Sequence, residues 1–325
     1  MFSSAHDADA YEYNRHGFGL RFSGEGMVGA AYPETIISDF RLRGQANYAV
    51  QPGWTSGVVY SIDELATSTG HFARDAFFLV ESPMGRMELG VTNSIAAKLG
   101  LGLPDVGALR VNEYSIAYKI TDNGNPIISN PVIDGGRYSL RANVVSVPTK
   151  PFQLGMSVVP WDPRFNTATD IGIKYRRPYG KTKLAASFGA SYIDEPRGLA
   201  ADIYAPRVTA DSRSQIAVGL NIQYNSWNWG LTARGIYDYN HIGSASDGLQ
   251  AGTGLSYDFL RFSASVSYIL SEVGVWHDSS ITTHTGIFSL RYKFDRHFDA
   301  WASGGLVSSA ENSQPFVAGG LRARF

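Results

Sequence analysis

Residues 38–50 read SDFRLRGQANYAV, and along this stretch apolar and polar side chains alternate. One parity carries the apolar side chains Phe40, Leu42, Ala46 and Tyr48. The other carries the hydrophilic side chains Asp39, Arg41, Arg43, Gln45 and Asn47. Because successive side chains of a strand point to opposite faces of a sheet, the stretch predicts a β-strand with one apolar and one charged face.

The same alternation recurs from residue 18 to the last residue of the sequence. It is clear at 18–32, 137–146, 215–224, 260–270 and 286–294, where apolar residues again oppose Arg, Ser, Asn, Gln or Lys. We therefore predict sixteen strands, at 18–32, 36–50, 55–63, 72–81, 86–91, 136–146, 152–161, 169–176, 182–193, 214–225, 227–239, 248–258, 260–270, 283–294, 298–309 and 316–325.

The connections between these strands alternate in length. Those after even-numbered strands are short and read QPGW, SPMG, PTK, PYGK, SW, DF and DRH, whereas the long ones at 64–71, 92–135, 194–213 and 271–282 follow odd-numbered strands. An even strand number with short turns at one end and long loops at the other is typical of a closed antiparallel barrel in an outer membrane.

Alternation alone also fits a soluble sandwich, whose apolar face points inward instead of toward lipid. Three features favour a lipid-facing barrel: the sequence ends in VAGGLRARF with Phe325 last, aromatic residues gather near strand ends, and the apolar parity is rich in Gly and Ala. Charged residues are 18% of the chain, below the roughly 25% usual in soluble domains. The aromatic residues near strand ends are Tyr48, Trp54, Tyr60, Trp161, Tyr192, Trp227, Trp229, Tyr237, Tyr239, Tyr257 and Phe294.

Several other classes of protein lack support in the composition. A net charge of −1 without a basic domain argues against a nucleic-acid partner. The absence of cysteine excludes disulfides and thiolate metal sites, and the seven histidines show no metal-binding spacing. No Ser–His pair is matched in parity at one rim of the predicted barrel, so we expect no enzyme. A weaker hypothesis is that calcium binds between loops or subunits, because carboxylates are its preferred ligands. The candidate ligands are Asp122, Asp134 and Asp247.

Residues 1–17 form a polar arm before the first predicted strand, and residues 18–325 read as one barrel domain. The first ten residues, MFSSAHDADA, lack the basic and apolar regions of a signal peptide. The chain is therefore either a cytoplasmic protein or the mature form of an exported protein with Met1 added, and we favour the second.

Three stretches resemble the general porins of Gram-negative bacteria, nearest the alphaproteobacterial type. GFGLRFSGEGMVGAAY resembles their opening strand, RDAFFLVESPMGRMELG their fourth strand, turn and fifth strand, and VAGGLRARF their closing strand. The long insertion at 92–135 follows directly. The resemblance implies a homotrimer of sixteen-stranded barrels in the outer membrane, in contact with lipid and lipopolysaccharide. Each barrel would pass small hydrophilic solutes, carry its third external loop inside, and present Phe325 as the signal for barrel assembly.

If the loop at 92–135 folds inward, Asp105 and Glu113 are the candidates to project into the pore, facing a wall of Arg21, Arg41, Arg43, Arg74 and Arg324. Opposed charges would set up a field across the constriction. In the alternative, Asp105 and Glu113 cap turns within the loop. Arg41 and Arg43 could likewise be solvated wall charges with no part in selectivity.

By parity, fifteen cations point into the lumen: Arg21, Arg41, Arg43, Arg86, Arg137, Arg141, Lys174, Arg176, Lys183, Arg234, Arg261, Arg291, Lys293, Arg322 and Arg324. The acids of that parity are Glu25, Asp39, Glu88, Asp170, Asp238, Asp258 and Asp299. This excess predicts a mild preference for anions. Two alternatives stay open, a substrate-selective channel of the same fold for an anionic or sugar solute and a soluble all-β binding protein. Rows of inward aromatic side chains would favour the selective channel, and Trp301 is the clear inward aromatic.

Overall fold

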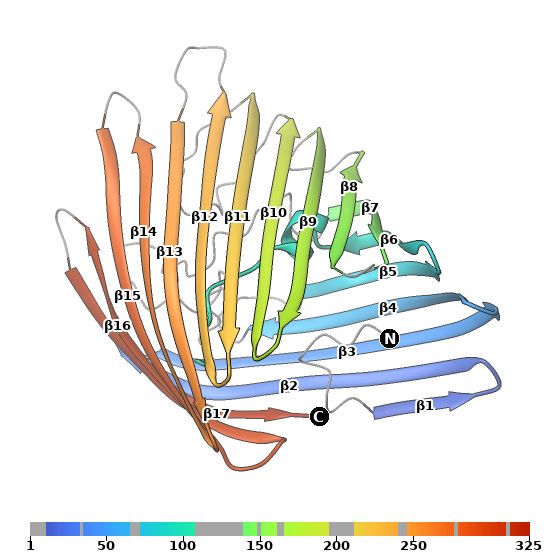
Figure 1. Ribbon diagram of the computed structural model, residues 1–325, viewed down its shortest axis with the longest axis horizontal. Coiled ribbons are helices and arrows are strands. Elements are labelled where there is room, and N and C mark those ends of the chain that lie inside the picture. Colours follow the sequence, from blue (N-terminus) through green and yellow to red (C-terminus); the bar gives the residue numbers. More distant parts are fainter. Residues whose placement is uncertain are drawn as a thin grey trace.

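The alternating stretch at 38–50 lies within strand β3 (Thr35–Gln51), which pairs antiparallel with β2 (Phe18–Tyr32) and β4 (Trp54–Leu65). Pairing continues from each strand to the next as far as β17 (Ser313–Arg324), which pairs back with β2 and closes a ring of sixteen strands (Figure 1). The computed structural model describes residues 11–32, 35–65, 72–107, 139–147, 151–160, 166–194, 211–239, 246–275, 279–309 and 313–325.

The sixteen strands confirm the predicted strand number and order. The strands between β4 and β17 are β5 (Phe72–Ser82), β6 (Gly85–Thr92), β7 (Ser139–Ser146), β8 (Phe152–Val159), β9 (Thr167–Tyr179), β10 (Thr182–Asp194), β11 (Ser212–Tyr224), β12 (Trp227–Tyr239), β13 (Ser246–Phe259), β14 (Phe262–Val275), β15 (Ser279–Lys293) and β16 (Phe298–Ser309). One short turn was misplaced. The predicted DF turn at 258–259 lies instead at Leu260 and Arg261, because Phe259 pairs directly with Phe262 and Leu260 adopts a left-handed φ of 52°.

An additional strand, β1 (Tyr11–Arg15), lies within the arm that was expected to precede the barrel. A two-residue turn of His16 and Gly17 folds it back onto β2, and both residues have positive φ, as a type I′ hairpin turn requires. Strand β1 pairs with Phe18–Phe22 of β2, whereas β17 pairs with Glu25–Tyr32 on the same edge. The two strands therefore occupy successive halves of one edge, with the C-terminus near the start of β1 (Figure 1).

The two faces of the ring differ as the alternation predicts. In β14 the inward Ser263, Ser265 and Ser267 are buried, whereas the neighbouring Val266 and Tyr268 are exposed on the outer surface. Two of the aromatic residues predicted near strand ends, Trp227 and Tyr257, pack with tilted rings whose centroids are 4.4 Å apart. Trp161 lies outside the described residues. The described part of the chain contains no helix long and apolar enough to span a membrane.

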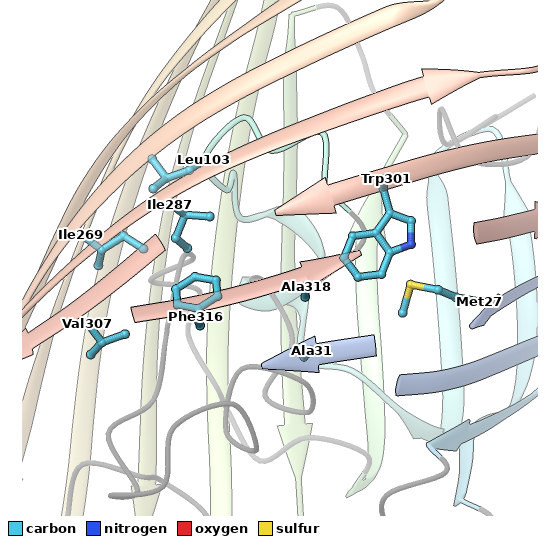
Figure 2. Close-up of a cluster of buried hydrophobic side chains, with 9 residues drawn as sticks. All are labelled: Met27, Ala31, Leu103, Ile269, Ile287, Trp301, Val307, Phe316 and Ala318. Carbon is cyan, nitrogen blue, oxygen red and sulfur yellow. The ribbon is translucent and has the colours of Figure 1, made fainter. Parts of the chain in front are cut away.

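Part of the inner face departs from the polar pattern. A cluster of buried apolar side chains joins β2, β14, β15, β16 and β17 to Leu103, which belongs to the long connection after β6 (Figure 2). Its members are Met27, Ala31, Leu103, Ile269, Ile287, Trp301, Val307, Phe316 and Ala318. Trp301 points inward as predicted and is 3% exposed. The inner wall is therefore apolar where an apolar residue of the connection packs against it.

Candidate functional site

The connection after β6 runs along the inner side of the barrel wall in its described part, residues 93–107. A short helix, α1 (Ile95–Leu99), begins at Ser94, whose hydroxyl accepts a hydrogen bond from the Ala97 N–H at 3.1 Å. The Ala96 N–H donates to Asp170 of β9 at 2.8 Å. Because Asp170 points inward from the wall, α1 lies against the inner face of the barrel. We call residues 93–107 the inward segment.

Glycines of the wall make room for the inward segment. A Cβ atom added to Gly155 of β8 would lie 2.6 Å from Ile95, and one added to Gly219 of β11 would lie 2.9 Å from Leu101. The tightest contact is at Gly230 of β12, where an added Cβ would lie 2.4 Å from the Cδ of Pro104. Such distances are shorter than van der Waals contact, so the segment reaches this position because the wall lacks side chains there.

Hydrogen bonds from strand after strand fix the same path. The Leu101 N–H donates to the Ser187 hydroxyl of β10 at 3.0 Å, and the Val106 N–H donates to the Ser265 hydroxyl of β14 at 3.1 Å. The segment thus crosses the wall from β8 to β14, and serine hydroxyls of the wall accept the backbone N–H groups of Leu101 and Val106. Satisfied donors keep a loop ordered in a cavity, because an unpaired buried amide is costly.

A charged cluster also holds the inward segment to β6, through Lys98. Lys98 contacts Glu88 of β6, donates to the Thr92 hydroxyl at 2.7 Å, and lies 5.1 Å from the ring centroid of Phe77. Arg86 binds Glu88 as well, with 3.0 Å between Arg86 Nε and Glu88 Oε1. Burial lowers the pKa of Lys98, while the Glu88 carboxylate opposes that shift. The cluster ties three charged side chains together and anchors the loop.

Asp105, one of the two predicted loop acids, lies on the inner wall and also caps a turn. Its Oδ1 accepts from the Gly107 N–H at 2.9 Å and from the Ser265 hydroxyl at 3.2 Å. The alternative interpretation of Asp105 as a turn cap therefore describes its contacts. Glu113 lies outside the described residues, and so does Arg137.

The arginines of the predicted wall differ in their neighbours: some adjoin acids, and one stands opposite a serine. Arg21 forms an ion pair with Glu12 of β1 at 3.4 Å, and Arg324 forms one with Glu25 of β2 at 3.2 Å. Arg41 lies directly opposite Glu25 in the register of β2 and β3, and Arg43 lies opposite Ser23. Arg21, Arg41 and Arg324 thus adjoin acids on neighbouring strands.

Arg74 was expected in the same wall, and its position in the strand pairing is irregular. Ser61 of β4 pairs with Asp75 and the adjacent Ile62 pairs with Ala73, so Arg74 is the extra residue of a bulge. Its side chain lies outside the described residues, and its place in the wall stays a prediction.

Further acids and cations on the wall were missed by the parity count. Arg213 of β11 forms a two-pronged pair with Asp238 of β12, with Nε–Oδ1 at 2.6 Å and Nη2–Oδ2 at 2.7 Å. Arg213 lies one residue before the predicted start of its strand, although it has the inward parity. Asp75 and Glu81 of β5 are also inward, since Asp75 bonds Ser61 and Glu81 pairs with Arg86 at 3.3 Å. The predicted cation excess is therefore smaller than the sequence indicated.

Several predicted inward charges are buried pairs. Arg322 of β17 binds Asp299 of β16 through Nε–Oδ1 at 3.0 Å and Nη2–Oδ2 at 3.0 Å, and Arg324 Nη2 lies 3.1 Å from the same Asp299 Oδ2. Arg141 Nη1 of β7 lies 3.3 Å from Asp170 Oδ2. Such pairs stiffen the wall and contribute little net charge to the lumen.

The C-terminal residue completes the ring. Phe325 exchanges two backbone hydrogen bonds with Gly24 of β2, at 2.8 and 3.0 Å. A Cβ added to Gly24 would lie 2.2 Å from the Phe325 ring, so the ring occupies the notch that the glycine leaves. A Cβ added to Gly44 would lie 3.3 Å from the Phe22 ring. The space beside Gly24 and Gly44 is therefore occupied by aromatic rings of the same barrel.

The described residues contain no group of three or more His, Asp or Glu side chains arranged to hold a metal ion. Of the residues proposed for calcium, Asp122 and Asp134 lie outside the described residues, whereas Asp247 lies in β13. The calcium hypothesis stays a prediction.

A family model described as Gram-negative porin matches residues 19–268. No curated protein sequence matches the chain.

Solved outer-membrane proteins share the fold at low sequence identity. OmpT of Vibrio cholerae superposes with a TM-score of 0.70 at 11% identity, covering 97% of this chain and 100% of that one. An anion-selective porin from Comamonas acidovorans gives a TM-score of 0.69 at 11% identity, covering 95% and 100%. Salmonella typhi OmpF, in complex with daunomycin, gives 0.69 at 11% identity, covering 97% and 100%. At identities this low, the likeness shows the fold alone.

Proposed function

The chain belongs to the Gram-negative porin family, and on that basis we propose that it lets small hydrophilic solutes and ions diffuse passively across the outer membrane, with a mild preference for anions. It is a multi-pass β-barrel of that membrane. The observation that carries the proposal is the closed ring with a polar inner face, narrowed by a segment bonded to the wall at Ser187 and Ser265. Passage through it requires no chemical step.

The inner charges support the anion preference. Three inward cations of β9 and β10 (Lys174, Arg176 and Lys183) form no ion pair among the described residues, whereas the described inward acids Asp170, Asp238 and Asp299 are all bound to arginines. A lumen lined by low-dielectric walls focuses the field of such charges onto permeating ions.

Bilayer electrophysiology tests this function. The purified protein should form open channels in planar bilayers, and a potassium chloride gradient should give a reversal potential displaced toward that of chloride. The displacement should shrink as salt rises, because screening shortens the reach of the wall charges. A protein that inserts without conducting would contradict the proposal, and a reversal potential toward potassium would contradict the anion preference alone.

A substrate-selective channel is not favoured by the described residues. Its mark would be a row of exposed aromatic rings along the lumen, but the inward Phe77, Trp301 and Phe316 are buried, with exposed fractions of 5%, 3% and 1%.

We further propose a homotrimer with the seam of β2, β3 and β17 at the subunit contact. A trimer form is recorded for Vibrio cholerae OmpT, a protein of the same fold. The outer face at this seam presents Val28, Tyr32, Val317 and Leu321, all more than half exposed. The remaining outward side chains suit lipid and lipopolysaccharide. Mass measurement of the complex in mild detergent should give three chains, and a monomer would contradict this assembly.

A further inference from the structure

A second charged feature of the lumen lies on β9 and β10, next to the inward segment. Lys174 and Arg176 have the inward parity of β9, with exposed neighbours Ile171 and Ile173 on the outer parity. Residues two apart on one strand are about 7 Å apart along the wall. Lys183 of β10 pairs with Pro178, and Ala185 pairs with Arg176, so Lys183 is the diagonal neighbour of Arg176. The diagonal spacing is about 7–8 Å.

The inward segment lies immediately beside this group. The next inward residue of β9 above Lys174 is Gly172, where an added Cβ would lie 3.0 Å from the Ile95 oxygen and 3.2 Å from Leu99 Cβ. The strand partner of Lys174 is Ser187, whose hydroxyl accepts the Leu101 N–H. The three cations therefore lie between the inward segment and the short turn at Gly180, on one side of the narrowed section.

The neighbours of the group are neutral. Lys174 stands opposite Gln153 of β8 in the strand pairing, and Lys183 stands opposite Gln223 of β11. The nearest inward acid on the same strand is Asp170, four residues or about 13 Å from Lys174. It is already bound to Arg141, Ser157 and the Ala96 N–H. Three cations with amide side chains beside them, and no acid to neutralise them among the described neighbours, are suited to an oxyanion.

We propose that Lys174, Arg176 and Lys183 form a transient binding subsite for small multivalent oxyanions, phosphate and phosphate monoesters in particular. The inference rests on the proposed channel function. Three cations within reach of one solute favour a divalent anion over a monovalent one, because each added charge interacts with the whole group. The site opens to the lumen, so the anion can also leave, as conduction requires.

Inorganic phosphate is the probe for the central experiment. Chloride current through single channels is measured in dilute potassium chloride at pH 7.5, with phosphate added to one side and nitrate as a monovalent control. Phosphate should reduce the chloride current at concentrations at which nitrate does not. In the triple variant Lys174→Gln, Arg176→Gln and Lys183→Gln, the half-inhibiting phosphate concentration should rise roughly fivefold or more, since the attraction is electrostatic.

Two matched variants separate the subsite from general charge. Arg41→Gln with Arg43→Gln removes inward cations elsewhere and should leave phosphate inhibition within about twofold of the wild type. Lys174→Arg with Lys183→Arg keeps all three charges and should retain the inhibition. Equal loss of inhibition in the Arg41 and Arg43 variant would overturn the proposal, and so would unchanged inhibition in the triple variant.

A second measurement tests the subsite even if the triple variant does not assemble. The chain has no cysteine, so Lys183→Cys gives a single thiol that charged reagents modify. A cationic reagent should restore phosphate inhibition and an anionic one should abolish it. Equal inhibition after both reagents would overturn the subsite. A wild-type chain that conducts chloride but shows no inhibition refutes the subsite alone, whereas a chain that never conducts refutes the proposed function.

Discussion

Two walls of the lumen carry similar numbers of cations but expose them differently. On the wall made by β16, β17 and β2, Arg322 and Arg324 share Asp299, and Arg324 also reaches Glu25. On the wall made by β9 and β10, Lys174, Arg176 and Lys183 have no acid partner among the described residues. We call these the paired wall and the unpaired wall. Strand alternation places both sets of cations inside, so it cannot account for the difference.

The difference comes from register. Arg322 stands directly opposite Asp299, and Arg324 stands opposite Glu25, so each cation meets an acid across the ladder. Lys174 stands opposite Gln153 on one side and Ser187 on the other. Opposite residues have Cβ atoms about 5 Å apart, close enough for charges to pair. The electrostatic character of a barrel wall is therefore decided by which residues face one another across strands, more than by the composition of each strand.

The largest effect should follow from breaking the paired wall. Asp299→Ala leaves Arg322 buried without its carboxylate, and loss of one partner of a buried pair costs about 3–5 kcal/mol. The free energy of unfolding, measured by urea titration in lipid vesicles, should fall by about that amount. Glu25→Ala is the control, because Glu25 is 21% exposed and its pair should contribute less. Similar losses in both variants would show that burial does not set the strength of this wall.

The seam beside the paired wall gives the next largest effect. Phe325→Ala removes the ring that fills the notch at Gly24 but leaves the backbone bonds between the two residues possible. We expect severalfold less folded barrel in the outer membrane of cells, both because the apolar contact is lost and because the terminal Phe is the predicted assembly signal. Comparing refolding in vitro separates the two causes. Unchanged yield in cells would contradict the predicted signal.

Charge removal compares the two walls directly. Lys174→Gln with Arg176→Gln should shift the chloride-to-potassium permeability ratio toward potassium by roughly threefold at low salt, because unpaired charges act in full on the permeating ion. Arg41→Gln with Arg43→Gln should shift it in the same direction by less than about twofold, since Arg41 stands opposite Glu25. Reversal potentials in a dilute salt gradient measure both ratios. A larger shift from the Arg41 and Arg43 variant would reverse the assignment of the walls.

The smallest effect concerns the position of the inward segment against β12. Gly230→Val puts a side chain where an added Cβ meets Pro104 at 2.4 Å, so the segment must move away from β12. Single-channel conductance should change by roughly half, because the narrowest section limits the current. Gly235→Val serves as the control, since nothing lies within 4 Å of a Cβ added there. Equal conductance in the two variants would mean that the glycine contact does not position the segment.

The sequence predicted the strands well because lipid and water impose a strict alternation on each strand. Arg41, Arg141 and Arg322 could be placed inside from parity alone. Their partners could not, because pairing of Arg141 with Asp170 depends on residues 29 positions apart and on the stagger between strands. Arg213 was missed because a strand end one residue away hid its parity. The apolar inner cluster left a faint signal in the doubled apolar pairs Ile287–Phe288 and Phe316–Val317, where both faces are apolar.

The division of the β2 edge between β1 and β17 has a consequence for the order of assembly. Glu25 and Arg324, which meet across the seam, are separated by 299 positions in the chain, so this contact must wait for nearly the whole polypeptide. The β1–β2 hairpin, by contrast, needs only its own two-residue turn and can be ready from the outset. Strand β1 occupies the edge of β2 at Phe18–Phe22, so β17 can pair with that edge only from Glu25 onward. The contact of β17 with β2 ends where Phe325 bonds Gly24. A slip of one residue would turn every side chain of β17 to the opposite face of the barrel, and a slip of β17 along β2 toward Phe18 would bring it up against the residues that β1 already pairs with.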